Sequence, residues 1–470
     1  MSKRQVVIIG GGFSGAAVAI HLARAARPEL EITVVEPRAQ VGQGVAYSTI
    51  DAAHRINVPA EKMALSPAEQ DSFEHWFEAV GGLRDDPEAR WHDGKIYPRR
   101  NAFGRYMAEK FVQAASGRAG NLRHLQDRAV DWRNGVVVTE KGVRLKADEV
   151  VLAISHPRPS LPRPLAQKLA NHPGLIADPW RNGALDGVAA TDRVAIIGTG
   201  LTMADMAASL HSRGHRGSIV AFSRHGLLSR PNITEDFPDW TPAAAPTLPN
   251  TPRGWLRRIR QDIRRAAAQR LPWQKVLDEI RTHGQQLWQQ WPLVEQRRFL
   301  RHLRAYWDAH RYRIAPQVSA LLAQQQAAGG LRVLAARLQQ AAADSDNVIA
   351  LTLRPRGGPL EMLYADKLIV TTGPAHGTLL DSNPLFRALA RRGELRADPL
   401  GLGLLVNEDS QAINQHGRAN PHLLVAGPAA RGRFGELIGF PQVADHAEAI
   451  AQRLLAAAAS AAAQRCPASS

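Results

Sequence analysis

The feature that constrains the fold most is a glycine run at Gly10–Gly15, set between strand-forming and helix-forming stretches. Residues 5–9 are a short β-branched run, typical of a buried parallel strand, and residues 16–24 have helical character. A second strand is predicted at residues 31–35, with Glu36 directly after it. A Gly-x-Gly-x-x-Gly turn in this strand–turn–helix–strand–acid order predicts a Rossmann unit that binds a dinucleotide.

Each position in this unit has a physical task. Gly10 allows the tight turn, Gly12 lets a pyrophosphate approach the backbone, and Gly15 permits close packing of helix on strand. The helix N-terminus faces the phosphates, and the Glu36 carboxylate is placed to accept a hydrogen bond from a ribose hydroxyl.

A second unit of the same kind begins with a predicted strand at residues 194–197. It continues through Gly198-Thr199-Gly200 and a helical stretch at 201–213, and reaches another strand at 218–222. Arg224 follows that strand. The chain therefore carries two dinucleotide-binding units in the same order.

The two units differ at two positions. Met203 stands where the first unit has Gly15, so we expect helix and strand to sit slightly farther apart in the second unit. Arg224 stands where the first unit has Glu36, and a cation there suits the 2′-phosphate of NADPH, although a plain surface charge is the alternative. We therefore expect FAD in the first unit and NADPH in the second.

Two further strands, at 148–154 and 366–370, each follow an acid and precede a turn of small residues, as where a chain crosses between nucleotide domains. The predicted fold is α/β, a double-Rossmann (two-dinucleotide-binding) protein with an inserted helical subdomain. The predicted segments are an FAD domain at 1–160 continued at 374–463, an NADPH domain at 161–373 with the insertion at about 235–345, and a disordered tail at 464–470.

The net charge of +16 is concentrated in one segment, since Arg253 to Arg313 holds 15 Lys and Arg against 5 Asp and Glu, together with five tryptophans. Basic residues among aromatics are also seen in nucleic-acid-binding proteins. Helical spacing of the apolar residues favours an amphipathic subdomain with a tryptophan core and no nucleic-acid partner, while some arginines are available to an anionic small molecule or a cofactor phosphate.

The lone cysteine, Cys466, excludes an intrachain disulfide or a redox pair. No zinc-ligand spacing or membrane-spanning stretch occurs, so we expect no metal, no membrane and a cytoplasmic location.

Several motifs in fixed order resemble the bacterial FAD/NAD(P)-binding oxidoreductases related to class B flavin monooxygenases, including their N-hydroxylating branch. The resemblance covers nearly the whole chain to about Leu455. The motifs are the first glycine turn, Gly42-Gln43-Gly44-Val45-Ala46-Tyr47-Ser48-Thr49, His54-Arg55-Ile56-Asn57-Val58-Pro59-Ala60, Phe103-Gly104-Arg105-Tyr106, Gly198-Thr199-Gly200-Leu201-Thr202-Met203-Ala204-Asp205, Tyr306-Trp307-Asp308-Ala309-His310-Arg311 and Gly427-Pro428-Ala429-Ala430-Arg431-Gly432.

This resemblance implies contacts for both cofactors. FAD would lie along Gly10, Gly12, Phe13, Ser14, Gly15, Glu36, Gln43, Tyr47, Asn57 and Arg105, with Gly427 to Gly432 closing over the flavin or its ribityl chain. NADPH would contact Gly198, Gly200, Thr202 and Arg224.

The resemblance also implies a monooxygenase in which NADPH reduces FAD and a C4a-hydroperoxyflavin transfers oxygen from O2 to a small amino- or carboxylate-bearing metabolite, including by N-hydroxylation. Asn57 is the candidate catalytic contact, or a residue that only holds its own turn. Arg311 and Arg313 are candidates for a substrate carboxylate, or ordinary surface arginines. The alternatives are a reductase that passes electrons to an acceptor other than O2, and a scaffold that keeps FAD structurally. The sequence does not decide between a monomer and a homo-oligomer.

Overall fold

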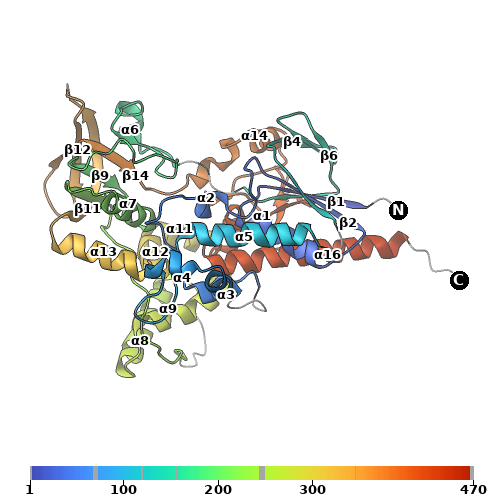
Figure 1. Ribbon diagram of the computed structural model, residues 1–470, viewed down its shortest axis with the longest axis horizontal. Coiled ribbons are helices and arrows are strands. Elements are labelled where there is room, and N and C mark those ends of the chain that lie inside the picture. The colour runs from blue at the N-terminus through green and yellow to red at the C-terminus, as the bar shows by residue number, and fades with distance from the viewer. Residues whose placement is uncertain are drawn as a thin grey trace.

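The computed structural model describes residues 3–66, 72–117, 120–154, 157, 159–242, 249–344 and 346–465, with side chains up to Ser460. These residues form an α/β protein built on two large sheets and one small one, which confirms the predicted class. In Figure 1 the elements of the two large sheets lie toward opposite ends of the long axis. Cys466 and residues 466–470 of the expected tail lie outside the described residues.

The first sheet is built around the first glycine turn. Its central strand pairs in parallel with the strands on both sides, and all three are buried, as expected for continuous β-branched runs. The strand order is β15 (Gln411–Ile413), β16 (Ala419–Val425), β7 (Glu149–Leu152), β1 (Arg4–Ile9), β2 (Leu30–Val35) and β3 (Leu122–Leu125). Because β16 pairs with β7, residues late in the chain complete a sheet that its first residues begin.

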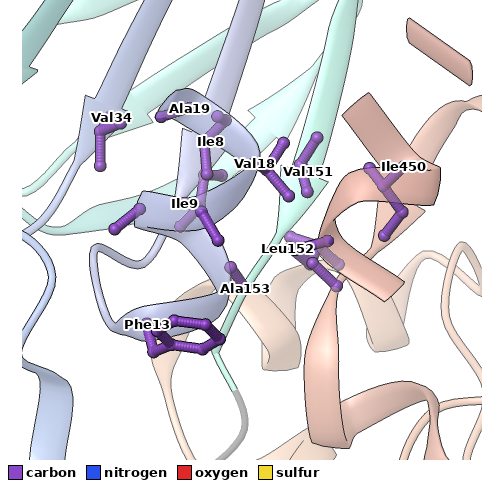
Figure 2. Packing of buried hydrophobic residues seen from close by; sticks show 14 of the residues in the cluster. Ile8, Ile9, Phe13, Val18, Ala19, Val34, Val151, Leu152, Ala153 and Ile450 are labelled. Atoms are coloured by element: carbon purple, nitrogen blue, oxygen red, sulfur yellow. The ribbon is translucent and has the colours of Figure 1, made fainter. Parts of the chain in front are cut away.

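Three helices cover this sheet. α1 (Phe13–Arg24) packs against α5 (Arg100–Ala115) and against the long α16 (Phe440–Arg465). Figure 2 shows side chains of β1 and β7 meeting those of α1 and α16, with Ile450 contributed from α16. The first nucleotide unit is therefore held in a core shared by both ends of the chain.

The second sheet repeats this arrangement around the second glycine turn. Its central strand pairs in parallel with strands on both sides, and the edge strand beyond one of these neighbours is also parallel. The last two strands at the other edge are antiparallel. The order is β13 (Glu361–Ala365), β12 (Ile349–Pro355), β11 (Leu331–Ala343), β10 (Ile219–Ser223), β9 (Val194–Ile197), β14 (Lys367–Val370) and β8 (Leu175–Ile176). α7 (Leu201–Ser212) and α13 (Pro316–Ala327) pack together beside it.

A helical insertion separates β10 from β11. Its helices are α8 (Pro252–Ala268), α9 (Trp273–Thr282), α10 (Gly284–Gln290), α11 (Leu293–His302) and α12 (Arg304–Arg311). The predicted end of the insertion near residue 345 is wrong, because residues 331–343 form β11, which pairs in parallel with β10 along the open edge that β10 offers. In Figure 1, α8 and α9 project away from both sheets.

Shorter elements complete the chain. A small antiparallel sheet contains β4 (Ala129–Arg133), β5 (Val136–Thr139) and β6 (Arg144–Lys146). The remaining helices are α2 (Gly44–Tyr47), η1 (Ala60–Lys62), α3 (Ser72–Ala79), α4 (Gly82–Asp85), η3 (Pro87–Ala89), α6 (Arg163–Lys168), η4 (His376–Asp381), α14 (Pro384–Arg391), η5 (Gly427–Ala430) and α15 (Arg431–Phe434).

A buried ion pair joins the two nucleotide units. The Arg100 guanidinium of α5 lies 2.9 Å from the Asp205 carboxylate of α7, and both side chains are nearly inaccessible to solvent. Beside them, the His54 ring lies 3.0 Å from the Ser209 hydroxyl. Because a buried charge without its partner is costly, this pair fixes how α5 and α7 meet.

Candidate active site

The first glycine turn can be built only with glycine at two of its positions. Gly10 has a φ of +105°, and a Cβ on Gly15 would lie 1.9 Å from the Gly10 carbonyl oxygen. α1 begins at Gly12, whose backbone is extended and which provides no side-chain cap. The amides of the first turn of α1 therefore have no capping side chain between them and an incoming phosphate, which fits the pyrophosphate of FAD.

Glu36 lies at the end of β2, beside this turn. Its side chain is buried, and one carboxylate oxygen accepts a hydrogen bond from the Gly11 amide at 2.7 Å. The other oxygen accepts from the backbone amide of Arg38 at 3.1 Å. The Glu36 carboxylate is therefore held beside the glycine turn. In a Rossmann unit this is the place of the acid that binds the ribose next to the pyrophosphate.

The second glycine turn opens on a cavity of about 370 Å³. Gly198 has a φ of +116°, and α7 begins at Gly200 without a side-chain cap. A Cβ on Gly200 would meet nothing within 4 Å, so the space beside it is open. The cavity is lined by Gly200, Thr202 and Arg224, three of the four residues predicted to contact NADPH.

Arg224 is exposed, and no carboxylate among the described residues lies within ion-pair distance of it. The neighbouring His225 also lines the cavity. Burial, followed by the positive charges of Arg224, Arg356 and Arg337, lowers the pKa of His225. This end of the cavity is therefore cationic, as a 2′-phosphate requires.

The late segment predicted to close over the flavin lies directly against the first turn. Gly427 has a φ of +75°, and a Cβ there would lie 2.3 Å from the Ser14 hydroxyl oxygen. The Gly427 amide donates to His446 Nδ1 at 3.1 Å, and His446 Nε2 lies 2.8 Å from the Ser410 hydroxyl. Burial lowers the pKa of His446 to about 4, so this ring is neutral near pH 7 and accepts the Gly427 hydrogen bond.

Gly432, at the end of the same segment, has no room for a side chain, because a Cβ would lie 2.3 Å from Asp398. Its carbonyl accepts a hydrogen bond from the Trp288 indole at 2.9 Å. Trp288 belongs to α10, so this bond joins the predicted flavin-closing segment to the helical insertion.

Two other predicted FAD residues lie together. Gln43 precedes α2 and Tyr47 is its last residue. This helix packs so closely on α5 that a Cβ on Gly104 would lie 2.3 Å from the Tyr47 carbonyl oxygen. The Tyr47 ring lies 4.8 Å from that of Phe103, and burial raises the pKa of Tyr47 to about 12. Phe13, at the start of α1, packs against Phe440, and the centres of the two rings lie 4.6 Å apart.

Arg105 follows Gly104 in α5. Its side chain is exposed, and its guanidinium carbon lies 5.9 Å from the centre of the Trp76 ring of α3. Contact between Arg105 and the flavin stays a prediction.

Asn57 joins its loop to the start of α13. Its side-chain oxygen accepts from the Ala315 amide at 3.4 Å, and its carbonyl accepts from the Asn232 side chain at 3.0 Å. These contacts hold the turn, and contact between Asn57 and the flavin stays a prediction.

The two arginines predicted to bind a substrate carboxylate are engaged with carboxylates of the chain. Arg311 Nε donates to Glu436 at 3.0 Å, and Arg313 donates to Asp278 at 2.7 Å. Both side chains are largely buried. Because these partners already neutralise them, the geometry does not support a substrate role for either arginine.

The tryptophans of the insertion line a cavity, so the predicted tryptophan core is hollow. The cavity has a volume of about 670 Å³ and lies among α8 to α12, with Leu402, Arg431, Gly435 and Glu436 completing the wall. Trp255, Trp273, Trp288, Trp291 and Trp307 all contribute to it.

Sequence reasoning did not single out Asp308 and Arg431, although both lie inside motifs that carry the family resemblance. Asp308 lines this apolar cavity and also the cavity of the second glycine turn, so the two compartments meet there. Nothing in the sequence marks this position, because it depends on how α12 is placed between the two cavities.

These features define a class: two glycine turns, each opening a helix without a side-chain cap, in the two-dinucleotide-binding flavoprotein fold. Residues 7–157 match the FAD-NAD(P)-binding family and so carry an FAD/NAD(P)-binding domain. No curated protein matches the chain in sequence.

Solved structures show the same fold over almost the whole chain. An L-lysine 6-monooxygenase from Pseudomonas syringae is 17% identical with a TM-score of 0.64, over 96% of this chain and 99% of the other. The ornithine hydroxylase PvdA from Pseudomonas aeruginosa is 16% identical with a TM-score of 0.60, over 96% and 100%. The ornithine N-hydroxylase KtzI from Kutzneria sp. 744, in a structure with reduced FAD, NADP+ and L-ornithine, is 15% identical with a TM-score of 0.61, over 97% and 99%.

The shared fold confirms the predicted fold class, and the family match agrees with the prediction that the chain binds FAD and NAD(P). No helix of the described residues is both long and apolar enough to cross a membrane. Within the same residues, no group of three or more His, Cys, Asp or Glu is arranged to hold a metal ion.

Proposed function

We propose that this protein is an NADPH- and FAD-dependent monooxygenase that N-hydroxylates a small amine-bearing metabolite. The observation that carries the proposal is that Asp308 lines two cavities: one follows the second glycine turn, and the other lies among the helices of the insertion. The place for NADPH and a separate compartment for a substrate are thus adjacent. The fold shared with ornithine and lysine N-hydroxylating enzymes supports this reaction.

The residues of the first unit would hold FAD. The uncapped start of α1 would bind the pyrophosphate, Glu36 the ribose, and the segment from Gly427 to Gly432 would close over the flavin. When bound, FAD carries two electrons from NADPH to O2. His446 keeps the closing segment in place through its bond to the Gly427 amide.

The second unit would bind and orient NADPH. Gly200 leaves room for the pyrophosphate, Thr202 lines the same space, and Arg224 would bind the 2′-phosphate. The helices of the insertion would line the substrate side of the site with apolar side chains. Asn57, near the junction with α13, stays the candidate for contact with the flavin.

The test is a labelling experiment on the purified FAD-loaded protein. NADPH and 18O2 are supplied with a panel of amines and amino acids, and NADPH consumption, H2O2 and products are measured. A monooxygenase gives a product that carries one 18O atom, and NADPH consumption that rises with that substrate. Release of all electrons as H2O2 with every amine, together with rapid reduction of artificial acceptors, would contradict the proposal and establish a reductase.

A further inference from the structure

Most of the wall of the cavity in the helical insertion is apolar. Trp255, Trp273, Trp288, Trp291 and Phe299 surround it together with aliphatic side chains such as Leu256. Such a compartment, of about 670 Å³, favours a ligand with a bulky apolar body, because burying that body against aromatic rings removes both from water.

One region of the wall is charged. Asp308 and Arg431 both line the cavity, and each has a buried atom without a hydrogen-bond partner among the described residues. These atoms are Asp308 Oδ1 and Arg431 Nη1. Arg431 is only 5% exposed, so water cannot easily satisfy its guanidinium.

The hydrogen bonds of Asp308 and Arg431 to their neighbours involve other atoms of the two side chains. The second oxygen of Asp308 accepts from Arg304 at 3.2 Å, and Arg431 Nε donates to the Gly435 carbonyl at 3.2 Å. Glu436 is already engaged, because it accepts from Trp307 at 2.6 Å and from Arg311 at 3.0 Å. One acceptor atom and one donor atom without hydrogen-bond partners therefore belong to side chains in the wall of the same cavity.

Asp308 is ion-paired with Arg304, yet its Oδ1 has no hydrogen-bond partner among the described residues, and a buried polar atom left in that state is costly. A ligand that carries both an amino group and a carboxylate would satisfy Asp308 and Arg431 at once. A ligand with only one of these groups would leave an atom of the other side chain without a hydrogen bond. Since Asp308 also lines the NADPH-side cavity, an amine bound to it would lie at the junction of the two compartments.

We propose that the cavity binds an α-amino acid with a bulky apolar side chain, the amino group contacting Asp308, the carboxylate Arg431, and the side chain lying among the tryptophans. This inference rests on the proposed function and names its substrate class. In the reaction, one N–H bond of the amine is replaced by N–OH. NADPH supplies two electrons, one oxygen atom of O2 enters the product, and the other leaves as water with two protons.

We expect the substrate class to differ from diamino acids with a short chain. The side chain of ornithine has only three methylene groups, so it would bury far less apolar surface against the aromatic wall than an indole would. The cavity therefore favours an amino acid with a bulky apolar side chain over ornithine.

Calorimetric titration of the FAD-loaded protein tests the assignment with four probes: L-tryptophan, tryptamine, indole-3-propionate and L-ornithine. We expect L-tryptophan to bind tightest. Tryptamine and indole-3-propionate, each lacking one charged group, should bind about tenfold or more weakly. L-ornithine should bind about 100-fold more weakly, because its side chain buries far less apolar surface than an indole. Binding of L-ornithine as tight as that of L-tryptophan, or no binding of any indole compound, would overturn the proposal.

Variants locate the binding site. Leu256→Trp fills the cavity and should weaken L-tryptophan binding at least tenfold, because its side chain lines the wall. Arg257→Trp adds the same group at an exposed position of the same helix and should leave binding unchanged. Equal effects of the two variants, at normal FAD content, would place the site elsewhere.

Asp308→Asn tests the amino-group contact. It should reduce the preference for L-tryptophan over indole-3-propionate to about threefold or less, an estimate based on loss of a charge-assisted hydrogen bond. A preference that persists unchanged would remove Asp308 from the site. If L-tryptophan binds as expected and no oxygenated product forms with any amino acid, the cavity assignment stands and the proposed function fails.

Discussion

The two nucleotide units share one chain order but differ in what surrounds their glycine turns. In the first unit, Gly15 packs so closely on Gly10 that no other residue fits, and the second strand ends in Glu36. In the second unit the equivalent helix position is Met203, which is fully buried in the core, and the second strand is followed by Arg224. The common order builds the phosphate site, and in the proposed assignment these local differences select FAD for the first unit and NADPH for the second.

The two units also differ in what lies next to their glycine turns. The first unit is closed by a late segment whose Gly427 lies against Ser14 and is held by His446. The second unit opens instead on a cavity that reaches the helical insertion at Asp308. A closed site suits a cofactor that stays bound through many turnovers, and an open one suits NADPH, which must enter and leave.

The largest expected effect concerns the tightness of the first turn. Gly15→Ala would place a Cβ 1.9 Å from the Gly10 carbonyl oxygen, so we expect a loss of more than about 3 kcal/mol and a protein without FAD. Met203→Leu, at the equivalent position of the second unit, should cost less than about 1.5 kcal/mol. Thermal unfolding and flavin absorbance measure both. A yellow Gly15→Ala protein of normal stability would break the comparison.

We expect the unfolding free energy to depend on pH through His446, which holds the segment that closes the first unit. Because burial lowers the pKa of His446 from 6.5 to about 4, its contribution is fully present above pH 6.5 and is lost as pH falls through 4. The loss is at most about 3 kcal/mol of unfolding free energy. Urea unfolding from pH 7 to pH 4 should show a smaller decline for His446→Gln than for the natural protein. Equal declines would mean that His446 is not the titrating group.

The smallest expected effect concerns cofactor choice in the second unit. Arg224→Ser should lower the preference for NADPH over NADH by about 10- to 100-fold, the worth of a charge-assisted hydrogen bond. Arg337→Ser is the matched control, since the charges of Arg337 and Arg224 both lower the pKa of His225. Flavin reduction rates with each nucleotide give the preference. An unchanged preference in Arg224→Ser, with a loss in the control, would move the phosphate site to Arg337.

The strands and helices beside the glycine turns could be predicted from sequence because local signals fix them. β-branched runs, glycine spacing and the following acid placed β1, α1, β2, β9, α7 and β10 to within one to three residues at each end. The end of the insertion could not be found this way, since β11 is defined by pairing with β10 across the inserted helices.

The residues near the proposed substrate cavity are positioned by contacts between segments far apart in the chain, and motif spacing does not predict such contacts. Arg311 was expected to meet a substrate, yet its partner is Glu436, far along the chain. Helical periodicity correctly indicated amphipathic helices in the insertion, but it does not say whether their apolar faces fill the space between them. The hollow among the tryptophans, and the position of Asp308 beside it, follow only from the assembled helices.

The most direct test of the account compares Gly12→Val with Gly200→Val. A Cβ on Gly12 meets only Gly44 at 3.5 Å and one on Gly200 meets nothing, so both variants should fold while blocking one pyrophosphate each. FAD content and anaerobic flavin reduction by NADPH are measured in both. The account predicts that Gly12→Val lacks FAD, whereas Gly200→Val keeps its FAD, is not reduced by NADPH and is still reduced by dithionite. Loss of FAD from Gly200→Val, or full FAD content in Gly12→Val, would contradict the assignment of FAD to the first unit and NADPH to the second.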